Sequence, residues 1–191
     1  MAIVIGKVSS VAEYFVGLGD HIICDAVSDY ASADLADLVN PKSMGNILDG
    51  STSYTGEAVS TEDWTNEQGI AITSTTSGGS ISYEFSVQDF TSEMLTLLLG
   101  AESISVTAVA FASTATAALG FGHKSNVITR PLMFLDETKT HFLIIPKAKI
   151  SASLGMDGKN HVINVVVTAE KLDTATLKTV MWVDAPAVYT T

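Results

Sequence analysis

The chain has a single cysteine and few basic residues. Cys24 alone cannot form an internal disulfide or a cysteine-based zinc site, and its place in the run His-Ile-Ile-Cys favours an inert buried thiol over a reactive one. Ten Lys and Arg residues stand against 21 Asp and Glu residues, which gives a net charge of −11. Because DNA binding requires Lys and Arg to neutralise phosphates, this balance argues against a protein that grips nucleic acid.

Motifs that carry catalysis or ligand binding are missing as well. The four histidines are scattered singly, without the His-Glu-x-x-His spacing, and no Gly-x-Ser-x-Gly motif occurs. Residues 120–125 (Gly-Phe-Gly-His-Lys-Ser) lack the glycine that directly precedes the lysine of a phosphate loop. The acidic residues do not have the spacing of a calcium-binding loop. We therefore predict that the protein is not an enzyme and uses no cofactor and no metal.

One uncharged stretch, residues 103–122, is long enough to suggest a membrane span. Six of its residues are Ser or Thr, and residues 103–111 alternate polar and apolar side chains as a strand does. We therefore predict no membrane insertion.

The clearest local pattern lies within residues 69–100. From Ile81 to Val87, apolar residues alternate with polar ones, which predicts an antiparallel strand with one packed face and one wet face. Residues 70–72 repeat the alternation, and residues 77–79 (Ser-Gly-Gly) tolerate the backbone of a tight turn. The pattern predicts a hairpin that turns at residues 77–79.

A helix is predicted next, over about residues 90–99. Asp89 suits the N-cap, because its carboxylate can accept N–H groups of the first turn, and Gly100 suits the C-terminal end. The apolar residues sweep roughly 200° of the helix, whereas a helix that serves one core needs a stripe of about 100°. These residues are Phe90, Met94, Leu95, Leu97, Leu98 and Leu99. The helix therefore lies deep in its own domain or contacts a second subunit.

An acidic segment precedes this unit. Residues 25–67 contain nine Asp and Glu residues and one base, Lys42. Residues 41–68 are rich in Gly, Ser, Thr, Asn and acids and have little periodicity, which predicts a long projecting loop or loose hairpin. Trp64 argues against plain disorder and is expected to anchor the segment where the chain re-enters the sheet.

Strand-like segments recur along the remaining chain. They are residues 103–111, 132–135, 141–145, 147–154, 161–169 and 179–183. One helix and no alternation of strand with helix predict a single domain over residues 1–191. Its fold class is mainly β, an antiparallel β-sandwich or barrel with one flanking helix.

Several features follow one another in a fixed order. They are the acidic projecting segment, Trp64, residues 69–74 (Gly-Ile-Ala-Ile-Thr-Ser), a Gly-Gly pair, residues 82–87 (Ser-Tyr-Glu-Phe-Ser-Val) and a helix that opens with Asp-Phe-Thr-Ser-Glu. This order, with the later hairpins, resembles the major tail tube proteins of long-tailed (siphovirus-type) bacteriophages. The resemblance implies a β-sandwich with a flanking helix. It also implies that six copies close into a ring and that rings stack into a hollow tail tube, the conduit for genome delivery into the host.

The resemblance further implies roles for particular residues. The helix would contact the neighbouring subunit through Phe90, Met94, Leu95, Leu98 and Leu99. The projecting segment would reach the next ring through Tyr54, Glu57, Glu62, Asp63 and Trp64. Glu84, on the polar face of its strand, is the candidate for the lumen, which in this family is negative, so that DNA passes without specific binding.

The expected partners are other copies of the chain, a tape-measure protein and other tail proteins. The expected location is the virion, after synthesis in the host cytoplasm. Two alternatives stay open. One is another virion component of similar fold, such as a tail terminator, a head–tail joining protein or a capsid decoration protein. The other is a β-sandwich module that binds a ligand or carbohydrate, which would require exposed aromatic residues on one sheet face.

Overall fold

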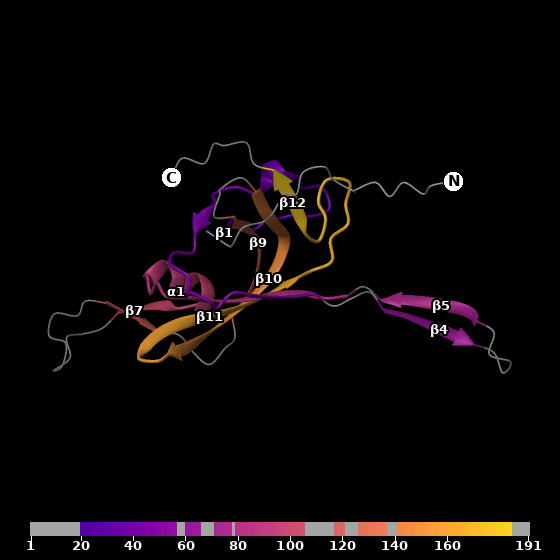
Figure 1. The fold of residues 1–191 in the computed structure, drawn as a ribbon. Helices are drawn as coiled ribbons and strands as arrows, with labels where there is room; N and C mark the ends of the chain where they lie inside the picture. Colours follow the sequence, from indigo (N-terminus) through magenta and orange to yellow (C-terminus); the bar gives the residue numbers. More distant parts are fainter. Residues whose placement is uncertain are drawn as a thin grey trace, which may run out of the picture.

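A computed structural model describes residues 20–56, 60–65, 71–77, 79–105, 117–120, 126–136 and 141–184. Within them, strands dominate and one α-helix occurs (Figure 1). The strands are β1 (His21–Ile23), β2 (Lys42–Ser43), β3 (Ser53–Gly56), β4 (Ser60–Thr65), β5 (Ala71–Ser77), β6 (Ile81–Val87), β7 (Glu102–Ser105), β8 (Ala117–Gly120), β9 (Val127–Leu135), β10 (His141–Asp157), β11 (Asn160–Ala169) and β12 (Met181–Asp184). The helices are the 3-10 turn η1 (Leu35–Asp37) and α1 (Ser92–Leu99).

Eight of the strands form one antiparallel sheet. Its order is β2-β1-β9-β10-β11-β6-β3, and β12 pairs with β10 beside this path. The pairs β4-β5 and β7-β8 form two small sheets. The predicted class, mainly antiparallel β with one flanking helix, is confirmed. The barrel alternative is not, because the described strands do not close into a barrel.

The long strand β10 belongs to both halves of the sheet. Its first part pairs with β9 and β12, and its second part pairs with β9 and β11. The register against β9 shifts between Ile145 and Ala148. Pro146 lies in this interval and has no N–H to donate to the ladder, so the strand bulges there. The bulge divides the sheet into two halves (Figure 1). The upper half contains β2, β1, β12 and the first part of β10 with the end of β9, and the lower half contains β11, β6, β3 and the second part of β10.

Aromatic rings join the inner faces of the two halves. The ring of Tyr83 on β6 stacks on that of Phe134 on β9, with centroids 4.8 Å apart. The ring of His21 on β1 lies 4.5 Å from that of Phe85 on β6. The sheet therefore folds over itself, and its main core lies between the halves. That core includes Leu132, Phe134, Ile145, Ile163 and Val167, all with no exposed area.

The helix α1 covers one end of this core. It begins after Thr91, whose hydroxyl accepts a hydrogen bond from the backbone N–H of Met94 at 3.2 Å. It ends at Gly100, whose φ of 64° is left-handed, so the prediction for Gly100 is confirmed. The predicted N-cap, Asp89, is wrong. Asp89 lies two residues before the true cap, and its carboxylate instead accepts both hydrogen bonds that Asn46 donates, each 3.0 Å long.

A short crossing segment, residues 42–48, spans the open side of the folded sheet. At one end, β2 pairs with β1, and the Met44 N–H donates to the His21 carbonyl at 2.8 Å. At the other end, Ile47 forms a bridge with Val87, and the Leu48 N–H donates to the Ser86 carbonyl at 2.8 Å. The crossing segment thus ties the β1 edge to β6 without completing a barrel.

Candidate assembly surfaces

The predicted projecting loop, residues 41–68, contains strands β2, β3 and β4. Ladder β3-β6 pairs Ser53 with Glu84, and ladder β4-β5 pairs Ser60 with Ser77. Ser60 lies seven residues after Ser53, and Ser77 lies seven residues before Glu84, so the two ladders have the same register. The two ladders are thus in register with one another, and we refer to them together as the ribbon. We call the β4-β5 stretch the arm. Figure 1 shows the arm extending away from the rest of the protein.

This pairing corrects the predicted turn at residues 77–79. Ser77 lies at the end of β5 and pairs with Ser60 on β4, so β5 does not turn back to pair with β6. Strands β5 and β6 instead follow one another along the same side of the ribbon. A Ser-Gly-Gly sequence permits a tight turn but does not require one. Here the ribbon partner, β3-β4, determines the direction of the chain.

Four of the five residues predicted for contact between rings lie in β3 and β4. Tyr54 is in β3, the last strand of the large sheet, and 58% of it is exposed. Its ring lies 4.8 Å from the ring of Tyr83, and burial raises the pKa of Tyr83 to about 12. Glu62, Asp63 and Trp64 lie in β4, opposite Thr75, Ser74 and Thr73. Their side chains, and Glu57 as a whole, lie outside the described residues.

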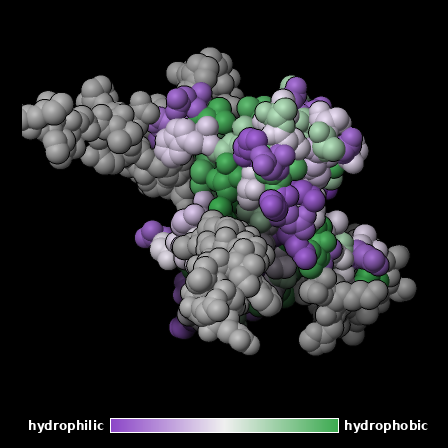
Figure 2. Space-filling view, turned by 90° about the vertical axis from the view of Figure 1, so that its right-hand side faces the viewer, coloured by the Kyte–Doolittle hydropathy of each residue, from purple (hydrophilic) through white to green (hydrophobic). Residues whose placement is uncertain are grey.

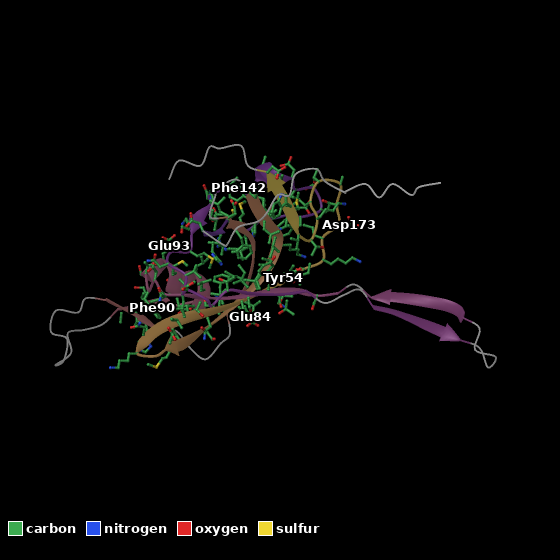
Figure 3. All side chains as sticks on the ribbon, viewed as in Figure 1. Tyr54, Glu84, Phe90, Glu93, Phe142 and Asp173 are labelled. Carbon is green, nitrogen blue, oxygen red and sulfur yellow. The ribbon has the colours of Figure 1, made fainter. Side chains whose placement is uncertain are left out.

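The predicted interface helix is divided between the core and the surface. Met94 and Leu98 are buried in this chain's own main core, so they are not accessible to a neighbour. Leu95 and Leu99 are half-buried and pack against the same core. Phe90, just before the helix, is 40% exposed, and its ring meets the ring of His161 edge-on (Figure 3). The centre of the apolar face of the helix is thus buried in its own domain, which was one of the two alternatives; the other was a contact with a second subunit.

The candidate lumen residue, Glu84, is exposed on the outer face of the sheet. The Ile81–Val87 alternation is confirmed, since Tyr83, Phe85 and Val87 are buried and Glu84 points away from the core (Figure 3). Antiparallel partners share a face, so register gives the residues beside Glu84. One row across five strands is Ser53, Glu84, Val166, Ser151 and Val127, and the next is Thr55, Ser82, Thr168, Lys149 and Thr129.

These two rows are rich in hydroxyl groups and nearly balanced in charge. They contain one carboxylate, Glu84, and one ammonium group, Lys149. Figure 2 shows one face of the protein, on which hydrophobic and hydrophilic residues are interspersed. The large negative charge of the chain is therefore not concentrated on this part of the sheet, and sequence reasoning from the total charge did not anticipate that.

A groove of about 390 Å³ lies between α1 and the end of β1. Ile23, Cys24 and Leu97 contribute apolar surface to it. Two ion pairs border it, Lys42 with Glu93 at 2.5 Å and Arg130 with Asp25 at 3.2 Å. Each positive group thus has a negative partner within the chain, and exposed pairs of this kind contribute little to stability. Sequence reasoning missed the groove, because its residues come from segments far apart in the chain.

Cys24 and His21 are two of the buried groups that could in principle carry chemistry. Cys24 is almost fully buried, and burial raises the pKa of its thiol to about 11, so the thiolate that reacts is scarce at neutral pH. His21 has no exposed area, and burial lowers its pKa to about 4. The described residues contain no cluster of His, Cys, Asp and Glu that could hold a metal ion. Among them, no helix is long and apolar enough to cross a membrane.

No protein-family model matches the chain, and no curated protein matches it.

Proposed function

We propose that the protein is a self-assembling structural subunit that forms stacked rings, as in the tail tube of a long-tailed bacteriophage. The observation that carries the proposal is the arm. It continues the register of the large sheet, extends away from it, and among the described elements packs extensively only within itself. An isolated two-stranded ribbon is marginally stable in water, so we infer that the arm is stabilised by packing against another surface.

A second copy of the chain is the partner that we infer for the arm. A protruding element that contacts a different surface of the next copy makes a head-to-tail contact, which closes into rings or extends into filaments. The large sheet also ends in the exposed strand β3, and an exposed edge is a template for pairing with another chain. One surface can then close the ring while the arm reaches the adjacent ring.

The outer sheet face supports the idea of a passage for DNA. The two rows described above present hydroxyls, one carboxylate and one ammonium group, so they offer no cluster of Lys and Arg to grip phosphates. In the proposed tube, this face with Glu84 lines the lumen. Tape-measure and other tail proteins are the further partners, and the virion is the location.

Electron microscopy of the concentrated purified protein tests the proposal. We expect rings and stacked tubes. A protein that stays strictly monomeric at high concentration would refute the assembly function and favour a ligand-binding module. Rings that never stack would favour a terminator or joining protein.

An arm-deletion variant tests the role of the arm. Replacing residues 58–79 with Asn-Gly closes β3 onto β6 through a two-residue turn and leaves their ladder in register. We expect normal circular dichroism, rings and no stacks. The matched control is Thr168→Ser, which alters the outer face and leaves the arm intact. Tubes of normal length from the arm-deletion variant would show that the arm is not the stacking element.

A further inference from the structure

The buried histidine His21 has an environment that suits an apolar residue better than an imidazole. It lies in β1, directly opposite Phe134 on β9, and has no exposed area. Its ring lies 4.5 Å from that of Phe85 and 5.0 Å from that of Phe134. Among the described residues, neither ring nitrogen has a hydrogen-bond partner. Buried polar atoms are nearly always hydrogen-bonded, so this exception calls for an explanation.

The position of His21 links it to the closure of the folded sheet. Phe85 belongs to β6 in the lower half, and Phe134 belongs to β9 in the upper half. The His21 carbonyl accepts the Met44 N–H, which is where the crossing segment meets β1. The imidazole therefore lies at the point where the two halves and the crossing segment meet.

We propose that His21 is a proton-operated lock that holds the β1 edge and the crossing segment against β6. While the ring is neutral, it fills the space between the two phenyl rings. Protonation places a positive charge among apolar groups, where it has no acceptor within hydrogen-bond distance. The charge is solvated only if the β1 edge separates from β6, so protonation opens the lock. This inference does not depend on the proposed function in assembly.

The groups that face His21 are mostly apolar or neutral. From β6 and β9 it meets Phe85 and Phe134, and the nearby Tyr83 stays neutral because its pKa is raised to about 12. Asp20, next in the chain, favours the charged imidazole but only partly offsets burial, which lowers the pKa to about 4.

The direction of the pH effect follows from these values. The unfolded chain takes up the proton near pH 6.5, whereas the folded protein resists it until about pH 4. The contribution to stability is therefore complete above pH 6.5 and is lost progressively as the pH falls from 6.5 to 4. At pH 5 the expected change is about 30-fold in the unfolding equilibrium constant. Hydrogen bonds lower the pKa of Asp25, Asp29 and Asp173, so these carboxylates stay ionised at pH 5.

Urea unfolding at pH 7.5 and pH 5.0 tests the proposal with two variants. His21→Phe keeps a ring of similar shape that cannot be protonated, and His161→Gln removes an exposed histidine as the matched control. We expect His21→Phe to remove the 30-fold component of the pH dependence and His161→Gln to retain it. A His21→Phe protein with the pH dependence of the wild type would overturn the proposal.

Hydrogen exchange of the wild-type protein gives a second test that needs no variant. After correction for intrinsic exchange rates, the amides of Met44 and Leu48 should be less protected than those of β11 at both pH values and should lose about 30-fold protection at pH 5.0, because the β1 edge opens without global unfolding. If Met44 and Leu48 are as strongly protected as β11, they exchange only through global unfolding, and the lock is refuted.

Discussion

Replacing Gly45 with alanine tests how the crossing segment is held. Gly45 has a φ of 79°, in the left-handed region where a side chain costs about 1 kcal/mol. A Cβ atom there would also collide with the Asp89 carboxylate. That carboxylate accepts the backbone and side-chain N–H groups of Asn46, and moving it breaks both hydrogen bonds. At about 1 kcal/mol each, the two bonds bring the expected loss in free energy of unfolding to about 3 kcal/mol.

A double-mutant cycle with Asp89→Ala separates the two contributions. Once the carboxylate is absent, Gly45→Ala should lower the free energy of unfolding by only about 1 kcal/mol, so the coupling energy is about 2 kcal/mol. Gly50→Ala is the matched control, because Gly50 has a φ of 71° and open space where a Cβ atom would lie. It should lose about 1 kcal/mol in either background.

Equilibrium unfolding in urea, followed by tryptophan fluorescence, measures all of these values. The reasoning fails if Gly45→Ala and Gly50→Ala cause equal losses. It also fails if the effects of Gly45→Ala and Asp89→Ala add within about 0.5 kcal/mol, since residues in contact should not behave independently.

Three further predictions concern α1 and the buried thiol. Thr91→Ala should lower the free energy of unfolding by about 1 kcal/mol in a urea titration, because it removes the N-cap oxygen; no change would contradict the cap assignment. Leu98→Ala should lower it by about 3 kcal/mol and Leu95→Ala by less, because Leu98 is fully buried and Leu95 is half-buried; equal losses would count against this difference. A thiol reagent at pH 8 should leave Cys24 unmodified in the native protein and react with it in urea, whereas rapid native labelling would disprove an inert thiol.

The alternating strand was the most predictable part of the fold. A period of two from Ile81 to Val87 dictates which side chains enter the core, and Tyr83, Phe85 and Val87 are buried accordingly. Gly100 was predictable for a related reason, since a left-handed residue commonly ends a helix and glycine adopts that conformation without strain. In both cases local backbone geometry decides the outcome.

Features that depend on a distant partner could not be predicted. The direction of the chain after Ser77 is fixed by its pairing with Ser60, and the role of Asp89 is fixed by Asn46, 43 residues away. The width of the apolar arc on α1 also did not separate core from surface. Met94 and Leu98 are buried and Phe90 is partly exposed because of where the sheet lies, which the helix sequence alone does not contain.

Strand β10 runs through both halves of the sheet, and this has a consequence for the order of folding. Neither half of the sheet can close until β10 is present, and β1 must find β9 more than 100 residues along the chain. Sheets dominated by such distant pairings fold in milliseconds to seconds, whereas a local hairpin forms in about 1–10 μs. The arm pairs residues 60–77, all close in sequence, so it is expected to form while the body is still open. Because an isolated two-stranded ribbon is only marginally stable, a chain emerging from the ribosome would form the arm transiently until the sheet gives it a base.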